Sequence, residues 1–450
     1  MMPPVEPTSY DQAPAIPSLP EVHRSIGIPT GVGFWRKLLA FSGPGFLVAV
    51  GYMDPGNWAT DIAAGSRFAY RLVFVLVISN LMAILLQTLA SRLGIVTQRD
   101  LAQACREYYS RRTGFLLWVV CEVAIAACDL AEVIGSAIAL NLLFHIPLLW
   151  GVCLTSLDVL AILYLQHRGF RYLEIVVVAL IGTIGACYLL EIIMVKPDFL
   201  GIARGFVPTP EIFFNSDMLY IAIGILGATV MPHNLYLHSS LVQTRVIERS
   251  AKGVRTAIRY NFLDSFLALN LAFLINAAIL VMAAGTFYRH GLTQIAEIQD
   301  AYHTLSPLLG LPLAGGLFAI ALLCSGQNST LTGTLAGQVV MEGFLNIRLA
   351  PWLRRLVTRL LAIVPAIIAV AFYGAHGTAK LIVFSQVILS LQLSFAVFPL
   401  VKFTSDRTKM GDFVNPRWLK ILAWLVAWVI LGLNAYLLVL TFRGWMRGSG

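Results

Sequence analysis

The stretch GPGFLVAVGYMDPGNWATDIAAG, residues 43–65, is apolar and long enough to cross a bilayer, but Asp54-Pro55-Gly56-Asn57 interrupts it halfway. The stretch YIAIGILGATVMPHNLYLHSSL, residues 220–241, is interrupted in the same way by Met231-Pro232-His233-Asn234. A proline inside a helix removes a hydrogen bond and kinks or breaks the helix. Either break alone could be a simple packing kink. Two breaks in matching places instead point to a ligand site at the bilayer midplane.

Each break exposes atoms that can bind a cation. The residue before a proline is pushed out of the helical region, and here these residues are Asp54 and Met231. Because proline has no N–H, the carbonyl four residues earlier loses its helical partner. These carbonyls belong to Gly51 and Ala228. The carboxyl ends of the two half-helices add negative dipole character, so the breaks together predict a cation site.

The composition places the chain in a membrane. Its 450 residues are 58% hydrophobic and 12% charged, whereas soluble domains are about 25% charged. Apolar runs of about 20 residues, enough to span a bilayer, recur along the chain. A soluble protein cannot bury that much apolar surface, so we expect an all-α polytopic membrane protein. We predict eleven transmembrane helices, near residues 41–66, 72–93, 115–144, 147–166, 172–195, 217–241, 261–285, 313–343, 360–374, 379–401 and 419–442.

The basic residues indicate the orientation in the membrane. Most of the 32 lysines and arginines fall in segments that share one side of the membrane. This positive-inside pattern predicts a multi-pass protein of the cytoplasmic membrane, with its N-terminus in the cytoplasm and its C-terminus outside. The net charge of +9 is thereby explained as an orientation signal, and nucleic acid is not an expected partner.

The breaks fall in the first and sixth predicted spans, which predicts two repeats of five helices. Because five is odd, the repeats must have opposite orientations in the membrane. A proline-rich segment without periodicity precedes them and is expected to be disordered. The expected regions are the cytoplasmic tail 1–40, the first repeat 41–195, the inverted repeat 217–401, and a final inner loop, eleventh helix and short outer C-terminus, 402–450.

The donors at the breaks favour a transition metal. Asp54 supplies charge, and Asn57 supplies a neutral oxygen three residues further on. Oxygen ligands alone would suit magnesium or calcium. The thioether of Met231 is a softer donor, which favours transition metals. The alternative is that Met231 only fills the core.

Two histidines follow the second break. His233 and His238 are five residues apart, so they cannot chelate one ion as a pair at i and i+4 would. We expect His233 to be a proton-linked group or a neighbour of the ligands rather than a direct ligand. His238 is expected to line the exit path, or else to be structural.

Three acids share one face of the third predicted span, namely Glu122, Asp129 and Glu132. Intramembrane acids rarely face lipid and often mark proton relays. We therefore expect a relay from the metal site toward the cytoplasm, whose inner end could pair with Arg354 and Arg355. A purely structural hydrogen-bond network is the alternative.

With these motifs the sequence resembles the Nramp (natural resistance-associated macrophage protein) family, in particular its bacterial MntH-like members. The resemblance covers nearly all of residues 40–440. Besides the two breaks it rests on GQNSTLTGTLAGQVVMEGF, residues 326–344, and SQVILSLQLSFA, residues 385–396. It implies a LeuT-like fold, a 5+5 inverted repeat with broken helices 1 and 6 plus one extra helix. It also implies proton-coupled uptake of manganese(II) and iron(II) by alternating access.

The resemblance further implies a ligand set. The metal would be bound by the side chains of Asp54, Asn57 and Met231 and by the carbonyls of Gly51 and Ala228, and Gln386 would join when the site is occluded. It supports the acid and arginine pathway for protons. Residue 51 is more often alanine in relatives, but a backbone ligand needs no particular side chain.

Other functions fit less well. A sodium-coupled amino-acid symporter of the same fold would bind a substrate carboxylate, which Asp54 would repel. A magnesium-transporting relative is disfavoured by Met231, and a signalling receptor by the short chain after the last span. We find no enzyme motif and expect no permanently bound cofactor. The expected partners are metal ions, protons and the lipid bilayer, and the sequence indicates no protein partner.

Overall fold

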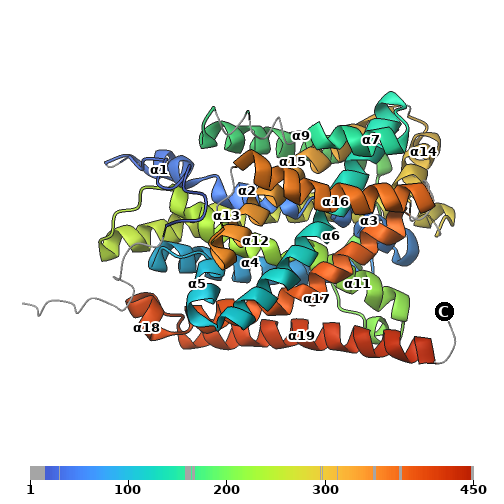
Figure 1. The fold of residues 1–450 in the computed structure, drawn as a ribbon. Coiled ribbons are helices and arrows are strands. Elements are labelled where there is room, and N and C mark those ends of the chain that lie inside the picture. The colour runs from blue at the N-terminus through green and yellow to red at the C-terminus, as the bar shows by residue number, and fades with distance from the viewer. Residues whose placement is uncertain are drawn as a thin grey trace, which may run out of the picture.

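The computed structural model describes residues 16–29, 31–157, 164, 168–293, 295, 297–311, 313–347, 351–373 and 378–446. Within these residues the fold is entirely helical (Figure 1), apart from one isolated β-bridge between Ile26 and Arg245. The α-helices are α1 (Phe34–Phe41), α2 (Pro44–Gly51), α3 (Pro55–Phe68), α4 (Val73–Thr97), α5 (Leu101–Tyr108), α6 (Arg111–Phe144), α7 (Leu148–Leu154), α9 (Phe170–Val195), α10 (Phe199–Gly205), α11 (Ser216–Thr229), α12 (Pro232–Leu241), α13 (Ala251–Thr286), α14 (Ile298–Leu309), α15 (Leu313–Leu345), α16 (Pro351–Tyr373), α17 (Thr378–Thr404), α18 (Arg407–Met410) and α19 (Arg417–Met446).

Seven helical segments of the described chain are long and apolar enough to cross a membrane, and the chain is a multi-pass membrane protein. They are α4, α6, α9, the joined α11 and α12, α13, α17 and α19. The other predicted spans coincide with the short pair α2 and α3, with α7, with α15 and with α16. Part of the span predicted at 147–166 lies outside the described residues. The number eleven therefore stays a prediction.

Both predicted helix breaks are present. Asp54 precedes Pro55 in extended conformation, with φ −68° and ψ 166°, and caps α3 by accepting the N–H of Asn57 at 2.8 Å. Met231 precedes Pro232 with φ −67° and ψ 123°. The pre-proline rule thus correctly predicted that Asp54 and Met231 lie outside the helical region, directly before the first residues of α3 and α12.

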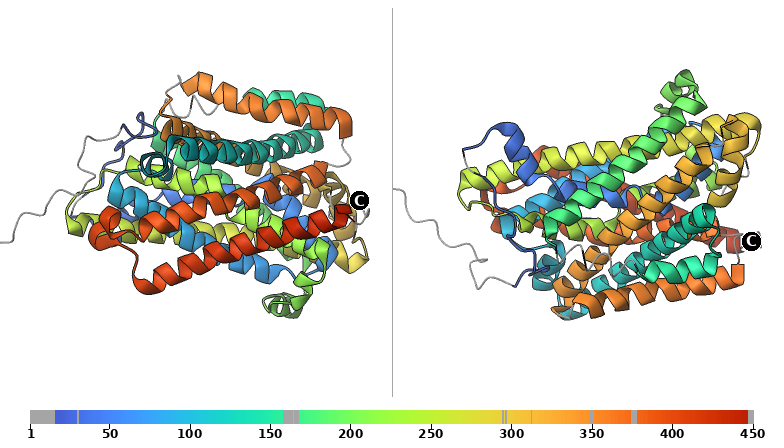
Figure 2. Two further views of the ribbon diagram at one scale, coloured as in Figure 1. Left: turned by 60° about the horizontal axis from the view of Figure 1, so that its bottom comes forward. Right: turned by 90° about the horizontal axis from the view of Figure 1, so that it is seen from above.

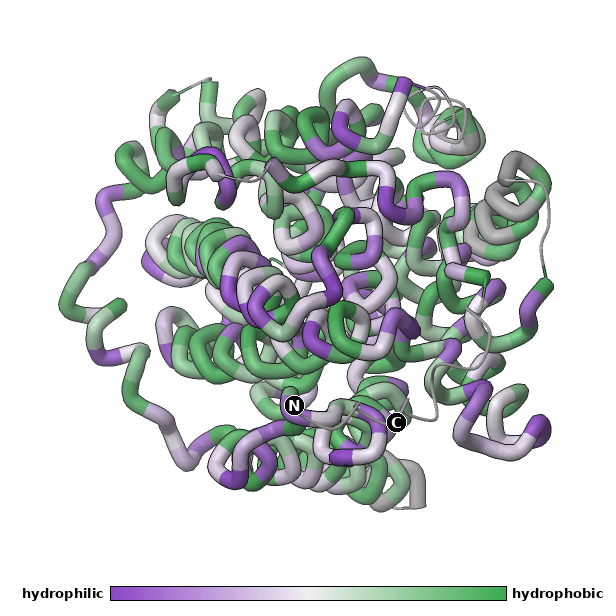
Figure 3. Tube along the Cα trace, turned by 90° about the vertical axis from the view of Figure 1, so that its left-hand side faces the viewer, coloured by the Kyte–Doolittle hydropathy of each residue, from purple (hydrophilic) through white to green (hydrophobic). Residues whose placement is uncertain are grey.

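The broken pairs lie at the centre of the molecule, where α4, α6, α13, α15 and α17 pack around them. All ten residues of α12 are buried. α19 runs along one edge beside α17, and α16 lies beside α6 and α7 away from α19 (Figures 1 and 2). Hydropathy along the chain is mapped in Figure 3. Large apolar side chains remain exposed on α9 and α19, as a lipid-facing surface requires.

The disorder predicted for residues 1–40 does not hold for the part of that region that the structure describes. Leu19 and Val22 are buried in the main core. The N–H of Leu19 donates to Oε2 of Glu342 on α15 at 3.0 Å, and the N–H of Ile26 donates to the carbonyl of Thr244 at 3.0 Å. Residues 1–15 and 30 lie outside the described residues. Proline content alone was misleading because Leu19 and Val22 supply the apolar anchors that hold the segment.

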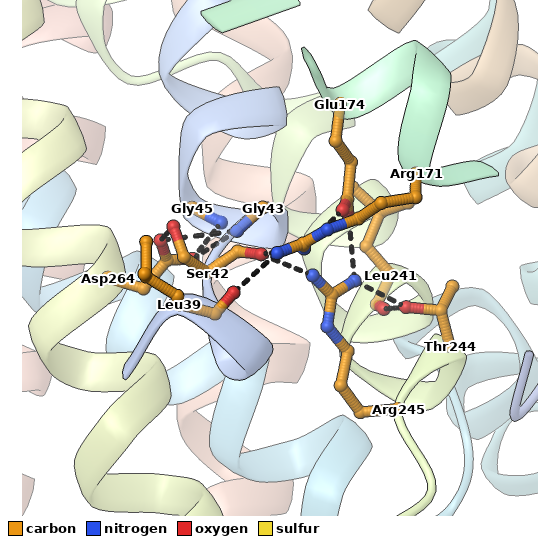
Figure 4. Close-up of polar contacts among 10 residues, drawn as sticks. All are labelled: Leu39, Ser42, Gly43, Gly45, Arg171, Glu174, Leu241, Thr244, Arg245 and Asp264. Atoms are coloured by element: carbon orange, nitrogen blue, oxygen red, sulfur yellow. Dashed lines mark hydrogen bonds and ion pairs between the residues drawn. The ribbon is translucent and has the colours of Figure 1, made fainter. Parts of the chain in front are cut away.

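The start of α2 is fixed by a buried ionic network (Figure 4). Asp264 on α13 accepts the N–H of Gly45 at 2.7 Å and the hydroxyl of Ser42 at 2.8 Å. A carboxylate at this place also complements the positive end of the α2 dipole. Arg245 pairs with Glu174 of α9 at 2.7 Å and donates to the carbonyl of Ser42 at 2.5 Å. The first half of the broken helix is thus tied to both α9 and α13.

Candidate metal site

The two breaks face each other in the interior. Asp54, Ala228 and Met231 have no exposed surface, and Asn57 is 1% exposed. α3 packs against α11 and α6, and α12 packs against α2, α6 and α17. The side chains and carbonyls that the two breaks release therefore enter one enclosed space rather than lipid.

Three oxygen atoms converge on the side-chain nitrogen of Asn57. Its Nδ2 lies 2.7 Å from Oδ1 of Asp54, 3.1 Å from the carbonyl oxygen of Ala228 and 3.2 Å from that of Gly51. A primary amide has two N–H donors, so it cannot fully satisfy three acceptors. Acceptors from both breaks thus surround a single point, which favours positive charge there.

The remaining predicted ligands border this point. A Cβ atom at Gly51 would lie 3.0 Å from Sδ of Met231, so the thioether lies against the first break. A Cβ atom at Gly56 would overlap Nε2 of Gln386 and lie 2.9 Å from Oδ2 of Asp54. Gln386 of α17 is buried, and its Oε1 has no hydrogen-bond partner among the described residues. The fold brings all six predicted ligand residues together.

The candidate site has few charged ligands. No group of three or more His, Cys, Asp and Glu residues in the described chain could hold a metal ion. The site at the breaks instead offers one carboxylate, neutral oxygens and a thioether. Such a set suits reversible binding of a divalent ion better than a permanent structural metal, which usually has four strong ligands.

Two of the three predicted relay acids lie near the site. Cys128 links Glu132 to Asp54, because its Sγ lies 3.6 Å from Oε1 of Glu132 and 3.9 Å from Oδ2 of Asp54. A Cβ atom at Gly333 of α15 would lie 2.9 Å from Oδ1 of Asp129 and 3.2 Å from Oε1 of Glu132. The two carboxylates therefore share one buried face between α6 and α15, beside the first break.

The other predicted relay residues are placed differently. Glu122 is half-buried and accepts a hydrogen bond from Nε1 of Trp118 on its own helix at 2.9 Å. Arg354 and Arg355 belong to α16, but their side chains lie outside the described part of the structure.

The two histidines have different surroundings. His233 is 2% exposed, and its Nδ1 has no hydrogen-bond partner among the described residues. His238 is fully buried and lies 2.9 Å from Oε1 of Gln87 through Nδ1 and 3.2 Å from Nδ2 of Asn261 through Nε2. Its polar atoms join α4, α12 and α13, so a structural role explains this residue as well as an exit path does.

Sequence reasoning missed three residues of the site. Nδ2 of Asn276 donates to the carbonyl of Tyr52 at 2.6 Å and to Oδ1 of Asn57 at 3.2 Å, which holds the amide of Asn57 in its orientation. Asn234 approaches Sδ of Met231 at 3.6 Å, and Cys128 contacts Asp54. The signals were available, since Cys128 is one turn from Glu132 and amide side chains within membrane helices commonly bond across helices.

Comparison with known proteins identifies the family. The family described as natural resistance-associated macrophage protein-like, Nramp, matches residues 45–440. The chain belongs to the Nramp family. Two Nramp relatives are named divalent metal cation transporter MntH. The one from a Nostoc species is 63% identical to this chain, over 96% of this chain and 97% of the relative. The one from Bradyrhizobium diazoefficiens is 60% identical, over 96% of each.

Solved structures agree with this Nramp assignment. The manganese transporter of Eremococcus coleocola, solved with an aromatic bis-isothiourea substituted compound, is 43% identical with a TM-score of 0.86, over 94% of this chain and 90% of that one. Mhp1 in its inward-facing conformation is 13% identical with a TM-score of 0.55, over 94% and 92%, and shows a shared fold alone. The predictions of an all-helical, LeuT-like transporter of this family, and not an enzyme, are confirmed.

The contact at Gly56 generates a prediction. Gly56→Ala should impair metal binding, because the added Cβ would overlap Nε2 of Gln386 beside Asp54. The amide end of Gln386 is flexible and can move aside, so the fold should persist. The expected loss is that of one neutral donor, about 0.5–1.5 kcal/mol, or about 2- to 13-fold in affinity. Isothermal titration of purified protein with manganese(II) measures the effect. Gly182→Ala on α9, where a Cβ meets no atom within 4 Å, is the matched control. Equal manganese affinity in both variants would contradict a role in metal binding for the Gln386 amide packed against Gly56.

Proposed function

We propose that the chain takes up divalent transition-metal ions, such as manganese(II) and iron(II), across the cytoplasmic membrane by proton-coupled alternating access. The observation that carries the proposal is the convergence of Asp54, Gly51 and Ala228 oxygens on the amide of Asn57. It is also supported by the names of the relatives, divalent metal cation transporters at 60–63% identity and a manganese transporter at 43%.

In this proposal the metal ion replaces the amide nitrogen of Asn57. The amide turns about its side-chain bond, so that Oδ1 faces the ion and Nδ2 leaves the three oxygens it now contacts. Asp54 then supplies the single charge, and Asn57, Gly51 and Ala228 supply neutral oxygens. Met231 adds the thioether, which calcium and magnesium do not favour as a ligand.

Gln386 completes the site when it is occluded. Its side chain already lies beside Asp54 and Gly56, and its oxygen lacks a partner among the described residues. An unpaired buried amide oxygen costs free energy, and a bound cation would remove that cost. One carboxylate among neutral donors keeps the affinity low enough for release, which a carrier requires.

Proton coupling is proposed to run along α6. Cys128 bridges Asp54 and Glu132, and Asp129 lies on the same face. His233, buried just after the second break, is the proposed proton-linked group on the other side of the site. The route beyond Asp129 and Glu132, toward Glu122, Arg354 and Arg355, follows from the family resemblance, and His238 is the proposed lining of the exit path.

The proposed topology is the one expected from the sequence: eleven spans, of which 41–195 and 217–401 form inverted repeats, and 402–450 is appended. The N-terminus is cytoplasmic and the C-terminus external. A negative interior then favours uptake by about 4.6 kcal/mol per 100 mV for a divalent ion. Alternating access would require the start of α2 to separate from Asp264 and Arg245, the contacts that now hold it.

The first experiment tests the role of Asp54. Asp54→Asn should abolish manganese(II) uptake into proteoliposomes, because it removes the only charge among the proposed ligands. The folded state should persist, since an amide fits the same space. Asp217→Asn, which changes an exposed acid on α11, should transport normally. Manganese uptake by the Asp54 variant at the rate of the control would refute the proposed site.

The second experiment tests the thioether. Met231→Ala keeps every oxygen donor, so uptake should continue, but calcium(II) and magnesium(II) should compete better against manganese(II). Cadmium(II), a softer ion, should lose more affinity than manganese(II). Competition uptake with all four ions measures this change. Met218→Ala removes a buried methionine from α11 away from the site and should leave the preference unchanged. An unchanged calcium-to-manganese preference in the Met231 variant would mean that Met231 only packs.

The third experiment tests the proton route. Glu132→Gln should reduce proton movement during metal uptake while the manganese KM changes by less than about threefold, because Glu132 is not a proposed ligand and is linked to Asp54 through Cys128. A pH-sensitive dye inside proteoliposomes reports the proton flux. Glu211→Gln, which affects only an exposed ion pair with Arg71, is the control. Loss of manganese affinity with intact proton flux would refute the relay.

A further inference from the structure

A cleft of about 630 Å³ lies away from the transport site, where α17 runs between α6 and α19 (Figure 2). Its walls are almost wholly apolar and include Leu117 of α6, Phe395 and Phe398 of α17, and Leu431 and Leu438 of α19. Phe395 and Leu438 are about half exposed, at 50% and 54%, so the cleft opens outward. Its volume lies within the range of about 300–1,000 Å³ that ligand pockets occupy.

The cleft has a fixed wall. Asn434 of α19 donates from Nδ2 to the carbonyl of Ser390 at 2.8 Å and accepts the Ser390 hydroxyl at 2.9 Å. This buried pair holds α19 against α17 beside the cleft. Trp424 and Trp428 pack edge-on against Phe398 with ring centroids 5.6 and 5.2 Å away. The cleft is therefore a built feature of the α17 and α19 contact.

One end of the cleft is both basic and aromatic. Tyr109 lines the cleft, and the ammonium of Lys402 lies 5.9 Å from its ring centroid. The same ammonium lies 4.6 Å from the ring centroid of Tyr108, and that of Lys409 lies 5.0 Å from it. Two positive charges thus meet at the end of the cleft where α17 finishes.

Further charges near this end keep it positive. Arg111 and Arg112 begin α6 and are exposed, directly before Thr113 in the cleft wall. Of the acids near this end, Glu107 is paired with Arg99 at 2.9 Å, Asp412 follows α18 and Asp406 precedes it. Burial alone would raise the pKa of the Asp406 carboxyl, but hydrogen bonds from Thr408 and the charges of Lys409 and Lys402 bring the pKa below its usual value. With Glu107 paired to Arg99, the two carboxylates of Asp406 and Asp412 against the four cations Lys402, Lys409, Arg111 and Arg112 still leave the end of the cleft electropositive.

We propose that this cleft binds an anionic phospholipid, with an acyl chain between α6, α17 and α19 and its phosphate at Lys402 and Lys409. A soluble phosphate compound fits the cleft less well than a phospholipid, because it has no apolar part to fill the space between the apolar walls. A zwitterionic lipid would fill the cleft but gain nothing from the net positive charge. Basic pockets between membrane helices on the cytoplasmic side are known binding places for anionic headgroups.

The test is native mass spectrometry of the full chain, purified in mild detergent and titrated with phosphatidylglycerol or with phosphatidylcholine of the same acyl chains. We expect the wild type to retain phosphatidylglycerol preferentially. Lys402→Gln with Lys409→Gln should weaken that retention by about 30-fold at low salt, from about fivefold per lysine. Phosphatidylcholine binding should change little. This readout needs no transport, so it stands or fails independently of the proposed function.

Two further variants separate charge from the cleft. Arg255→Gln with Arg259→Gln removes two exposed charges from the start of α13, away from the cleft walls, and should leave phosphatidylglycerol retention unchanged. Ala435→Trp adds a bulky side chain to the cleft wall without changing charge, and should lower retention. Equal retention of both lipids by the wild type would overturn the proposal. Phosphatidylglycerol retention that is unchanged in the double lysine variant or in Ala435→Trp would also overturn it. The same holds if the double arginine variant loses as much retention as the double lysine variant.

Discussion

The rest of the structure depends on the helical hydrogen bonds that Pro55 and Pro232 cannot make. Each proline frees one carbonyl, Gly51 or Ala228, in the middle of a membrane protein where water cannot satisfy it. The amide of Asn57 now contacts both carbonyls and Asp54 at once. Two donors for three acceptors leave a shortage of positive charge, which a divalent cation can remove. The same backbone geometry that breaks the helices thereby makes the site.

The sequence was sufficient where local backbone chemistry decides the outcome. The extended conformations of Asp54 and Met231 followed from the prolines after them, and the family followed from the motifs around them. Contacts between distant helices were not predictable in the same way. Asn276 reaches Asn57 across 219 positions, and Leu19 reaches Glu342 across 323. Such pairs depend on how whole helices pack, which neither periodicity nor composition specifies.

The start of α2, which alternating access is proposed to move, is held by several buried contacts. These contacts come from Asp264 and Arg245, and Arg245 forms a nearly fully buried ion pair with Glu174, exposed by 1% and 4%. Breaking a buried pair by removing one partner typically costs about 3–5 kcal/mol. The segment of residues 16–29 adds backbone hydrogen bonds to the residues after α12. The protein therefore holds the half-helix that carries Gly51 firmly at its start. At the break, the N–H groups of Tyr52 and Met53 close the last turn on the carbonyls of Ala49 and Val50, and the Gly51 carbonyl bonds to the Asn57 side chain instead of a helical N–H.

In the proposed site, a metal ion takes the place of the Asn57 amide nitrogen. Anomalous X-ray diffraction from crystals of the protein grown with manganese(II) measures this directly. We predict one manganese peak coordinated by Asp54, by the carbonyls of Gly51 and Ala228 and by Met231, with Oδ1 of Asn57 turned toward it. A peak among Asp129 and Glu132 with none at the breaks, or no peak at saturating manganese with the amide of Asn57 still bonded to all three oxygens, would contradict the account.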